Sequence, residues 1–269
     1  MPFAEHDGAR IYWSALGRGE PLVLIMGLGC SSALWFRLAP RLARDYRVIL
    51  IDNRGVGQTV VEPSVVHRVS TMAGDVAAVL DAAGEKSAHV FGLSMGGMIA
   101  QQFALDHPAR VRSLLLAATN CGGPQAILAQ PEVRQLLFSK SDMTREESLR
   151  AWRAYTYARQ TPDSVIEEDH QVRLANFPTL EGYLAQLHGL IEWSSFEFLP
   201  RLQCPTLVLH GAEDQLVPPQ NGRLLAAAIP GAELIEMERA SHWVHTDQPE
   251  QTVAAMNAFI RSAPAGASP

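Results

Sequence analysis

Short, continuously apolar runs alternate along the chain with longer segments in which apolar residues recur at helical spacing. Runs of this kind are typical of strands buried on both faces of a sheet, and the longer segments are typical of amphipathic helices. The pattern predicts strands at 22–26, 48–51, 88–92, 113–118, 207–209 and 233–237. It predicts helices at 34–44, 70–83, 220–229 and 249–260, another between Ser94 and Pro108, and an N-terminal hairpin of 3–6 and 10–15 around Asp7-Gly8.

Strands that alternate with helices indicate an α/β fold with a mostly parallel, doubly wound sheet. Residues 122–203 interrupt this rhythm, because they are helix-like and contain no convincing strand. We therefore expect a core formed by residues 1–121 and 204–262, with an inserted helical cap at 122–203. The tail 263–269 consists of small residues and proline, and we expect it to be disordered.

Composition and charge narrow the range of partners. The chain has 269 residues and a formal net charge of -6, without a basic cluster, which argues against a nucleic-acid partner. No apolar run is long enough to span a bilayer, and three cysteines without a C-x-x-C pair suit a reducing compartment, so we expect a cytoplasmic protein. The sequence contains neither a cofactor fingerprint nor a metal-ligand cluster, so we expect no cofactor and no metal. It is compatible with a homo-oligomer.

A serine, an acid and a histidine are predicted to share one edge of the sheet. Gly92-Leu93-Ser94-Met95-Gly96 joins a predicted strand to a predicted helix, which is the context of a G-x-S-x-G nucleophile elbow. Asp214 follows the strand at 207–209, and His242 follows the strand at 233–237. Side chains beyond the carboxyl ends of parallel strands meet at one edge, and serine needs a base and an acid to become nucleophilic.

These segments, together with Met26-Gly27-Leu28-Gly29 and Asp52-Asn53-Arg54-Gly55, resemble the α/β-hydrolase superfamily over nearly the whole chain. The similarity is to cofactor-free bacterial esterases and 3-oxoadipate enol-lactonase-like hydrolases. The resemblance implies Ser94 as nucleophile, Asp214 as acid and His242 as base, with the backbone N–H groups of Leu28 and Met95 as the oxyanion hole. It implies a small-molecule ester or lactone as substrate.

Each assignment has an alternative. Glu213 adjoins Asp214, and His245 lies one helical turn past His242. The same catalytic groups support C–C bond hydrolysis, perhydrolysis or acyl transfer, and a low-turnover ligand sensor could retain them.

We expect the substrate pocket to be apolar. Its candidate walls are Met26, Trp35, Trp152, Tyr155, Trp193 and Trp243. The arginines closest to the site by sequence are Arg54, Arg150, Arg153 and Arg159, and surface salt bridges account for them more simply. Because an unpaired buried charge is costly, the apolar character of these walls predicts a substrate without charge near the scissile carbonyl.

Overall fold

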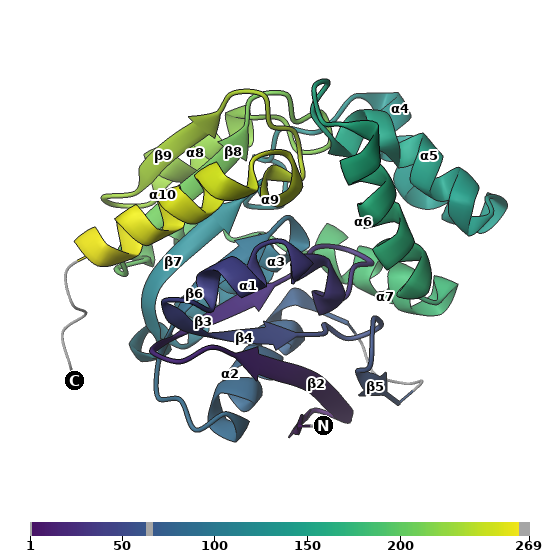
Figure 1. Cartoon of the computed structure of the whole chain (residues 1–269). Coiled ribbons are helices and arrows are strands. Elements are labelled where there is room, and N and C mark those ends of the chain that lie inside the picture. The colour runs from purple at the N-terminus through teal and green to yellow at the C-terminus, as the bar shows by residue number, and fades with distance from the viewer. Residues whose placement is uncertain (1, 63–66, 264–269) are drawn as a thin grey trace.

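The computed structural model describes residues 2–62 and 67–263. A twisted sheet runs through its centre, with the strands in the order β1-β2-β4-β3-β6-β7-β8-β9 (Figure 1). The parallel strands are β3 (Glu20–Ile25), β4 (Tyr46–Ile51), β6 (Ala88–Leu93), β7 (Val111–Ala117), β8 (Thr206–Gly211) and β9 (Glu233–Met237). The predicted strands are therefore present, each within two residues of its expected start.

The N-terminal edge of the sheet is antiparallel. Strands β1 (Phe3–His6) and β2 (Ala9–Leu16) form the predicted hairpin, and β2 pairs with β4. Asp7 and Gly8 turn the chain with φ of 42° and 68°, the left-handed values that a two-residue hairpin turn requires. The short strand β5 (Val60–Val61), which the sequence pattern does not predict, pairs with β2.

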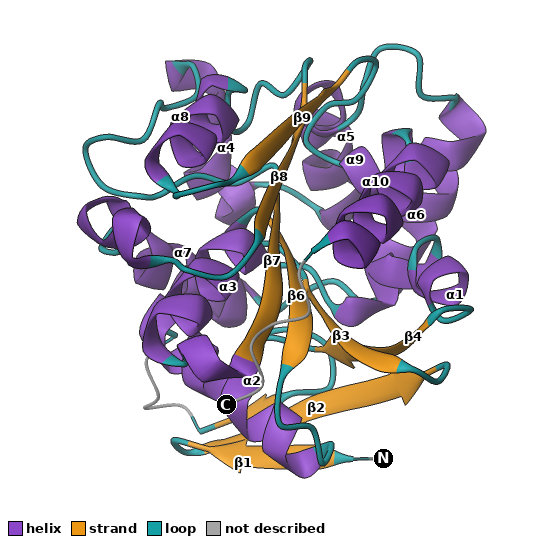
Figure 2. Cartoon of the chain, turned by 90° about the vertical axis from the view of Figure 1, so that its left-hand side faces the viewer, coloured by secondary structure: helices purple, strands orange, loops and turns teal. Residues whose placement is uncertain are grey.

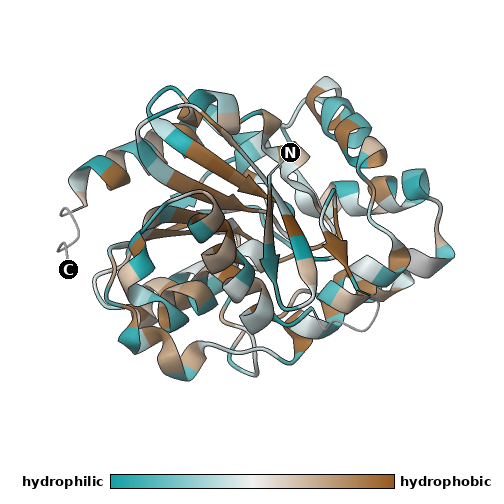
Figure 3. Ribbon diagram, turned by 90° about the horizontal axis from the view of Figure 1, so that it is seen from below, coloured by the Kyte–Doolittle hydropathy of each residue, from teal (hydrophilic) through white to brown (hydrophobic). Residues whose placement is uncertain are grey.

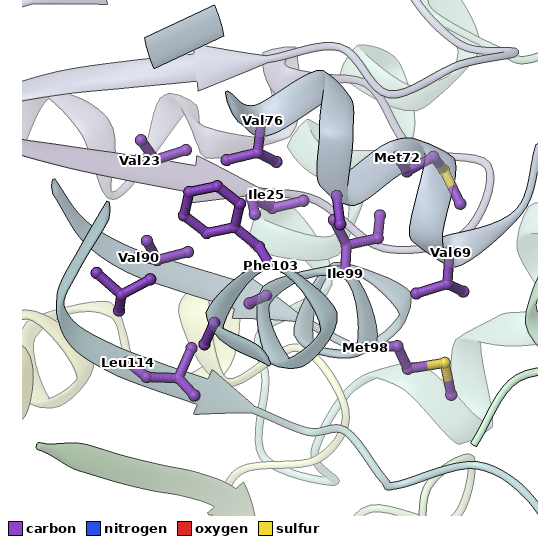
Figure 4. Close-up of a cluster of buried hydrophobic side chains, with 14 of the residues drawn as sticks. Val23, Ile25, Val69, Met72, Val76, Val90, Met98, Ile99, Phe103 and Leu114 are labelled. Atoms are coloured by element: carbon purple, nitrogen blue, oxygen red, sulfur yellow. The ribbon is translucent and has the colours of Figure 1, made fainter. Parts of the chain in front are cut away.

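Helices cover both faces of the sheet (Figure 2). One face carries α2 (Val69–Ala82), α3 (Met95–Asp106) and α8 (Gln220–Ala228), and the other carries α1 (Ala39–Leu42), α9 (Val244–Asp247) and α10 (Pro249–Ser262). Because side chains alternate along a strand, Val23 and Ile25 of β3 face the first layer, whereas Leu22 and Leu24 face the second. Figure 4 shows Ile99 and Phe103 of α3 within the first of these two cores.

One local prediction about a helix was wrong. In place of one helix over 34–44, the chain forms a 3-10 turn at Ser32–Phe36 and then the short helix α1. Pro40 lacks an N–H group, so it fits the start of α1 but cannot lie inside a helix that begins at residue 34. Helix α2 begins at Val69 after Arg68, one residue before the predicted start of this helix. Gly84 follows the helix with a φ of 74°, as a helix-terminating glycine should.

Four helices lie between β7 and β8. They are α4 (Pro131–Phe138), α5 (Arg145–Thr156), α6 (Asp163–Ala175) and α7 (Leu180–Ile191), and they gather on the right-hand side of Figure 1. We call residues 122–203 the cap segment. Figure 3 shows hydrophobic colour along the central strands and mixed colour on the surrounding helices, as expected for amphipathic helices on a buried sheet. Most of the predicted disordered tail lies outside the described residues.

Candidate active site

Ser94 occupies a strained turn between β6 and α3. Its φ of 57° and ψ of −123° are unusual for a residue with a Cβ atom, and such strain persists only where the surroundings impose it. The surroundings here include two glycines. A Cβ atom on Gly92 would overlap the carbonyl oxygen of Gly96, and one on Gly96 would overlap that of Ile25. The Ser94 N–H donates to the Ala117 carbonyl at 2.9 Å, which holds the turn against β7.

Asp214 and His242 form a buried pair at the same edge of the sheet. Nδ1 of His242 lies 2.9 Å from Oδ2 of Asp214, and both side chains are almost completely buried. The other carboxylate oxygen accepts the N–H groups of Leu216 and Val217 at 2.9 and 2.8 Å. The carboxylate is thus fixed on one side by its own loop, and its free oxygen faces the imidazole.

The environment of Asp214 favours its charged form. Burial alone would raise the pKa of this carboxyl. The charge of His242 and hydrogen bonds from His210 and His242 outweigh burial, so the pKa of Asp214 lies below its usual value. His210 donates from Nε2 to the Val217 carbonyl at 2.8 Å, and the same nitrogen lies 3.4 Å from Asp214 Oδ2. His210 therefore helps to stabilise the charged form of Asp214.

The two alternative residues lie elsewhere. Glu213 accepts the Arg159 N–H at 3.1 Å, so its carboxylate faces the cap segment. The ring of His245 is buried between Trp35 and Trp243, with centroid distances of 5.1 and 5.3 Å. Neither ring nitrogen of His245 has a hydrogen-bond partner among the described residues. Burial, reinforced by the positive charges of His242 and Arg37, lowers the pKa of His245 to about 3, so it is neutral at physiological pH.

A cavity of about 470 Å³ opens between this edge of the sheet and the cap segment. Ser94 and His242 line it, together with Leu28 and Met95. The predicted oxyanion donors therefore border the same space as the serine. Their backbone N–H groups have no hydrogen-bond partner among the residues that the structure describes.

Most of the cavity wall is apolar, but three of the six predicted wall residues do not contribute to it. Met26, Trp152 and Trp243 line the cavity. Trp35 is fully buried against Phe91 in the core behind the sheet. Trp193 turns toward α3, where its indole N–H donates to Gln102 at 2.8 Å. The side chain of Tyr155 is half-buried and does not line the cavity. Its backbone carbonyl accepts the Ser241 hydroxyl, next to His242, at 3.5 Å.

Two cations that the sequence analysis did not name as candidates lie at the pocket. Arg134 of α4 and Arg173 of α6 both line the cavity. The Arg173 guanidinium lies over the Trp243 ring, 4.8 Å from its centroid. Nη1 of Arg173 is buried without a hydrogen-bond partner, and no carboxylate among the described residues forms an ion pair with this side chain. No aspartate or glutamate of the described chain lines the cavity, so its charged lining groups are cationic.

The four arginines that lie closest to the site by sequence do not line the cavity. Arg54 is fully buried in an ion pair with Asp75, at 2.7 Å, and Arg153 pairs with Asp163 on the surface. Arg150 and Arg159 are exposed. No sequence signal distinguishes Arg173 from these residues, because its position depends on how α6 packs.

Among residues 2–62 and 67–263, no group of three or more histidine, cysteine, aspartate or glutamate side chains could hold a metal ion. Within the same residues, every helix is too short or too polar to cross a membrane.

The chain is similar to several known proteins. The model of a family described as "alpha/beta hydrolase fold" matches residues 20–249. A candidate carbamate hydrolase of Azorhizobium caulinodans is 31% identical over 245 residues, which cover 90% of this chain and 91% of the relative. A thermophilic esterase from Thermogutta terrifontis, solved with malate bound, is 29% identical with a TM-score of 0.81, covering 94% of this chain and 93% of the other. An N-acyl homoserine lactone degrading enzyme, Est816, is 29% identical with a TM-score of 0.83, covering 96% of this chain and all of the other.

Proposed function

Because the chain belongs to the alpha/beta hydrolase fold family and is a hydrolase, we propose that it cleaves a carboxylic ester or lactone through an acyl-enzyme formed on Ser94. One observation carries the proposal. His242, which is paired with buried Asp214 at 2.9 Å, lines the same cavity as Ser94 of the strained elbow. The two solved relatives, an esterase and a lactone-degrading enzyme, support this substrate class.

The proposed reaction follows from the roles of these groups. Nδ1 of His242 donates to Asp214, which leaves Nε2 as the basic nitrogen that takes the proton from Ser94 Oγ. The serine oxygen attacks the carbonyl carbon, and the protonated imidazole then gives its proton to the departing alkoxide. Water, activated by the same nitrogen, releases the acid and restores Ser94. Asp214 fixes the tautomer and stabilises the imidazolium.

The N–H groups of Leu28 and Met95 are the proposed oxyanion donors. Met95 is the first residue of α3, and the N–H groups of a first helical turn have no acceptor within their own helix. The positive end of the α3 dipole adds to this effect. Loss of one such donor typically costs about 3 to 4 kcal/mol in the transition state.

The proposed substrate carries an anionic group, most simply a carboxylate, on an otherwise apolar acyl chain. Arg173 is the basis for this choice, because its guanidinium faces an apolar cavity without a carboxylate partner. A substrate carboxylate would supply the missing acceptor. The malate bound to the Thermogutta terrifontis relative, which is itself a dicarboxylic acid, is consistent with this proposal.

Replacement of Ser94 tests the mechanism. We expect Ser94→Ala to lower kcat on p-nitrophenyl esters by about a million-fold. A fluorophosphonate probe should label the wild-type protein and leave the variant unlabelled. Circular dichroism and thermal unfolding of the variant serve as controls for folding. Retention of most activity by folded Ser94→Ala protein would exclude the acyl-enzyme.

A further inference from the structure

Gln186 of α7 connects the cap segment to two loops at the catalytic edge of the sheet. Its side chain is completely buried. Oε1 accepts the Gly29 N–H at 2.7 Å, and Nε2 donates to the Arg54 carbonyl at 2.6 Å. One side-chain amide therefore satisfies a backbone group from the loop after β3 and another from the loop after β4.

The Gly29 N–H belongs to a tight turn that contains a proposed oxyanion donor. The Cys30 N–H donates to the Gly27 carbonyl at 3.2 Å, which closes a four-residue turn over 27–30. Gly29 has a φ of 68°, the left-handed value that the third position of a type II turn requires. Leu28 is the second residue of this turn. When Gln186 holds the Gly29 N–H, it fixes the peptide plane between Leu28 and Gly29.

Few other groups could orient this peptide plane. The Asn53 side chain donates to the Met26 carbonyl at 2.9 Å, before the turn. Asp52 accepts the Ser32 N–H at 2.8 Å, after the turn. Between these two anchors, and among the residues that the structure describes, Gln186 supplies the side-chain hydrogen bond to the backbone of the turn itself. The Leu28 N–H lies in the adjoining plane, between Gly27 and Leu28, and the Gly27 carbonyl of that plane accepts the Cys30 N–H that closes the turn. A shift of the Leu28–Gly29 plane would therefore move the Leu28 N–H through the closed turn. Because hydrogen-bond strength depends steeply on direction, such a shift would misalign this N–H with the developing oxyanion.

Helix α7 is held against the core closely enough to act as a rigid support. Gly182 packs directly on the backbone of Gly55, and a Cβ atom on Gly55 would lie 2.8 Å from the Gly182 oxygen. One helical turn past Gln186, a Cβ atom on Gly189 would overlap the His67 carbonyl oxygen. Contacts of backbone on backbone on both sides of Gln186 leave little freedom for α7 to slide or rotate.

We propose that Gln186 is a positioning residue for the oxyanion hole, through which the cap segment sets the geometry of transition-state stabilisation. This inference rests on the proposed serine hydrolase function. The side chain does not line the cavity, so its effect is on the Leu28 N–H and not on substrate binding. Its loss should therefore lower kcat and leave KM nearly unchanged.

The test compares Gln186→Met with the wild-type enzyme on a neutral p-nitrophenyl ester. Methionine has a similar shape, cannot donate a hydrogen bond and is only a weak acceptor. We expect kcat to fall by about 10- to 300-fold, with KM within about twofold of wild type. A trifluoromethyl ketone, whose adduct with Ser94 places an oxyanion in the same position, should lose affinity by a similar factor. Gln186→Asn, too short to reach Gly29, carries the same expectation if the methionine variant does not fold.

Ser195→Ala is the matched control. Ser195 also lies in the cap segment and donates a buried hydrogen bond to the core, at 2.8 Å to Gln101, but it does not touch the 27–30 turn. We expect this variant to lose thermal stability with kcat within about twofold of wild type. An equal fall in kcat for both variants, or a Gln186 variant with wild-type kcat, would overturn the proposal. In either case, inactivity of Ser94→Ala would leave the proposed hydrolase function intact.

Discussion

Arg173 gives the sharpest prediction about substrate choice. Its guanidinium lies over Trp243, the residue after the proposed base, and has no carboxylate partner among the described residues. Arg173→Met removes the charge and keeps an unbranched apolar side chain at the same position on α6. The variant should therefore discriminate less between anionic and neutral acyl chains, while the rest of the cavity keeps its shape.

The size of the effect follows from the burial of this side chain. A hydrogen bond to a charged group typically contributes about 1.5 to 3 kcal/mol, which corresponds to about 10- to 150-fold in kcat/KM. Arg173 is only half-buried, so solvent screening favours the lower end of this range. Loss of the stacking on Trp243 affects both kinds of substrate alike and cancels in their ratio. We expect the preference for the anionic substrate to fall by about tenfold.

The assay uses p-nitrophenyl monoesters of glutaric and adipic acid, each with a free carboxylate, against p-nitrophenyl esters of monocarboxylic acids of equal chain length. The measured quantity is the ratio of kcat/KM between each matched pair. Arg173→Lys should give an intermediate ratio, because lysine keeps the charge without the planar fork of donors. Added salt should reduce the wild-type preference.

Arg150→Met is the matched control, because Arg150 is an exposed arginine of the same cap segment that does not line the cavity. It should leave the ratio unchanged. If Arg173→Met also leaves the ratio within about twofold of wild type, Arg173 does not bind the acyl chain. A wild-type preference for the neutral esters would restore the uncharged substrate that the sequence predicted.

Two further predictions concern the acid and the buried histidine. Asp214→Asn should lower kcat by about 10⁴-fold and Glu213→Gln by less than tenfold in steady-state ester hydrolysis, and the reverse order would identify Glu213 as the acid. His242→Ala should abolish most of the ester hydrolysis, whereas His245→Phe should retain most of it. The folded-state pKa of His245 is about 3, well below its unfolded value. The free energy of unfolding of the wild-type protein should therefore decrease as pH falls below about 6.5. The free energy of unfolding of His245→Phe, measured in urea relative to wild type, should therefore rise by about 2 kcal/mol between pH 8 and pH 5. Equal pH dependence of the two proteins would contradict the buried neutral histidine.

The sheet was predictable because its signal is local. A strand buried on both faces needs a continuous apolar run, and the residues after each run must lie at one edge when the strands are parallel. Ser94, Asp214 and His242 could be placed together in this way without any knowledge of side-chain contacts. The choice of Asp214 over Glu213 was made from spacing, and the 2.9 Å contact with His242 agrees with that choice.

The cavity wall was much less predictable. An aromatic residue in a helix can face the ligand, the cap interior or the core, and helical periodicity alone does not distinguish these outcomes. Trp152 lines the cavity, whereas Trp193 binds Gln102 on α3. Trp35 follows the 27–30 turn in sequence but packs behind the sheet, because the chain bends at the 3-10 turn before Pro40. These positions depend on tertiary packing that no single segment encodes.

Gln186 left a weak signal that can be recognised in retrospect. It shares one face of α7 with Tyr183, Leu187 and Leu190, at spacings of three and four residues, and it carries the one amide of that stripe. Burial of an amide in an apolar stripe requires partners for both of its ends. The residues of this stripe have two kinds of contact. Tyr183, Leu187 and Leu190 line the cavity, whereas Gln186 forms hydrogen bonds to the core loops. Under the proposed mechanism, substrate contacts and oxyanion geometry therefore depend on the same helix. It follows that enlarging the pocket at Leu187 should alter kcat as well as specificity in hydrolysis of p-nitrophenyl esters, and a change of specificity alone would contradict this coupling.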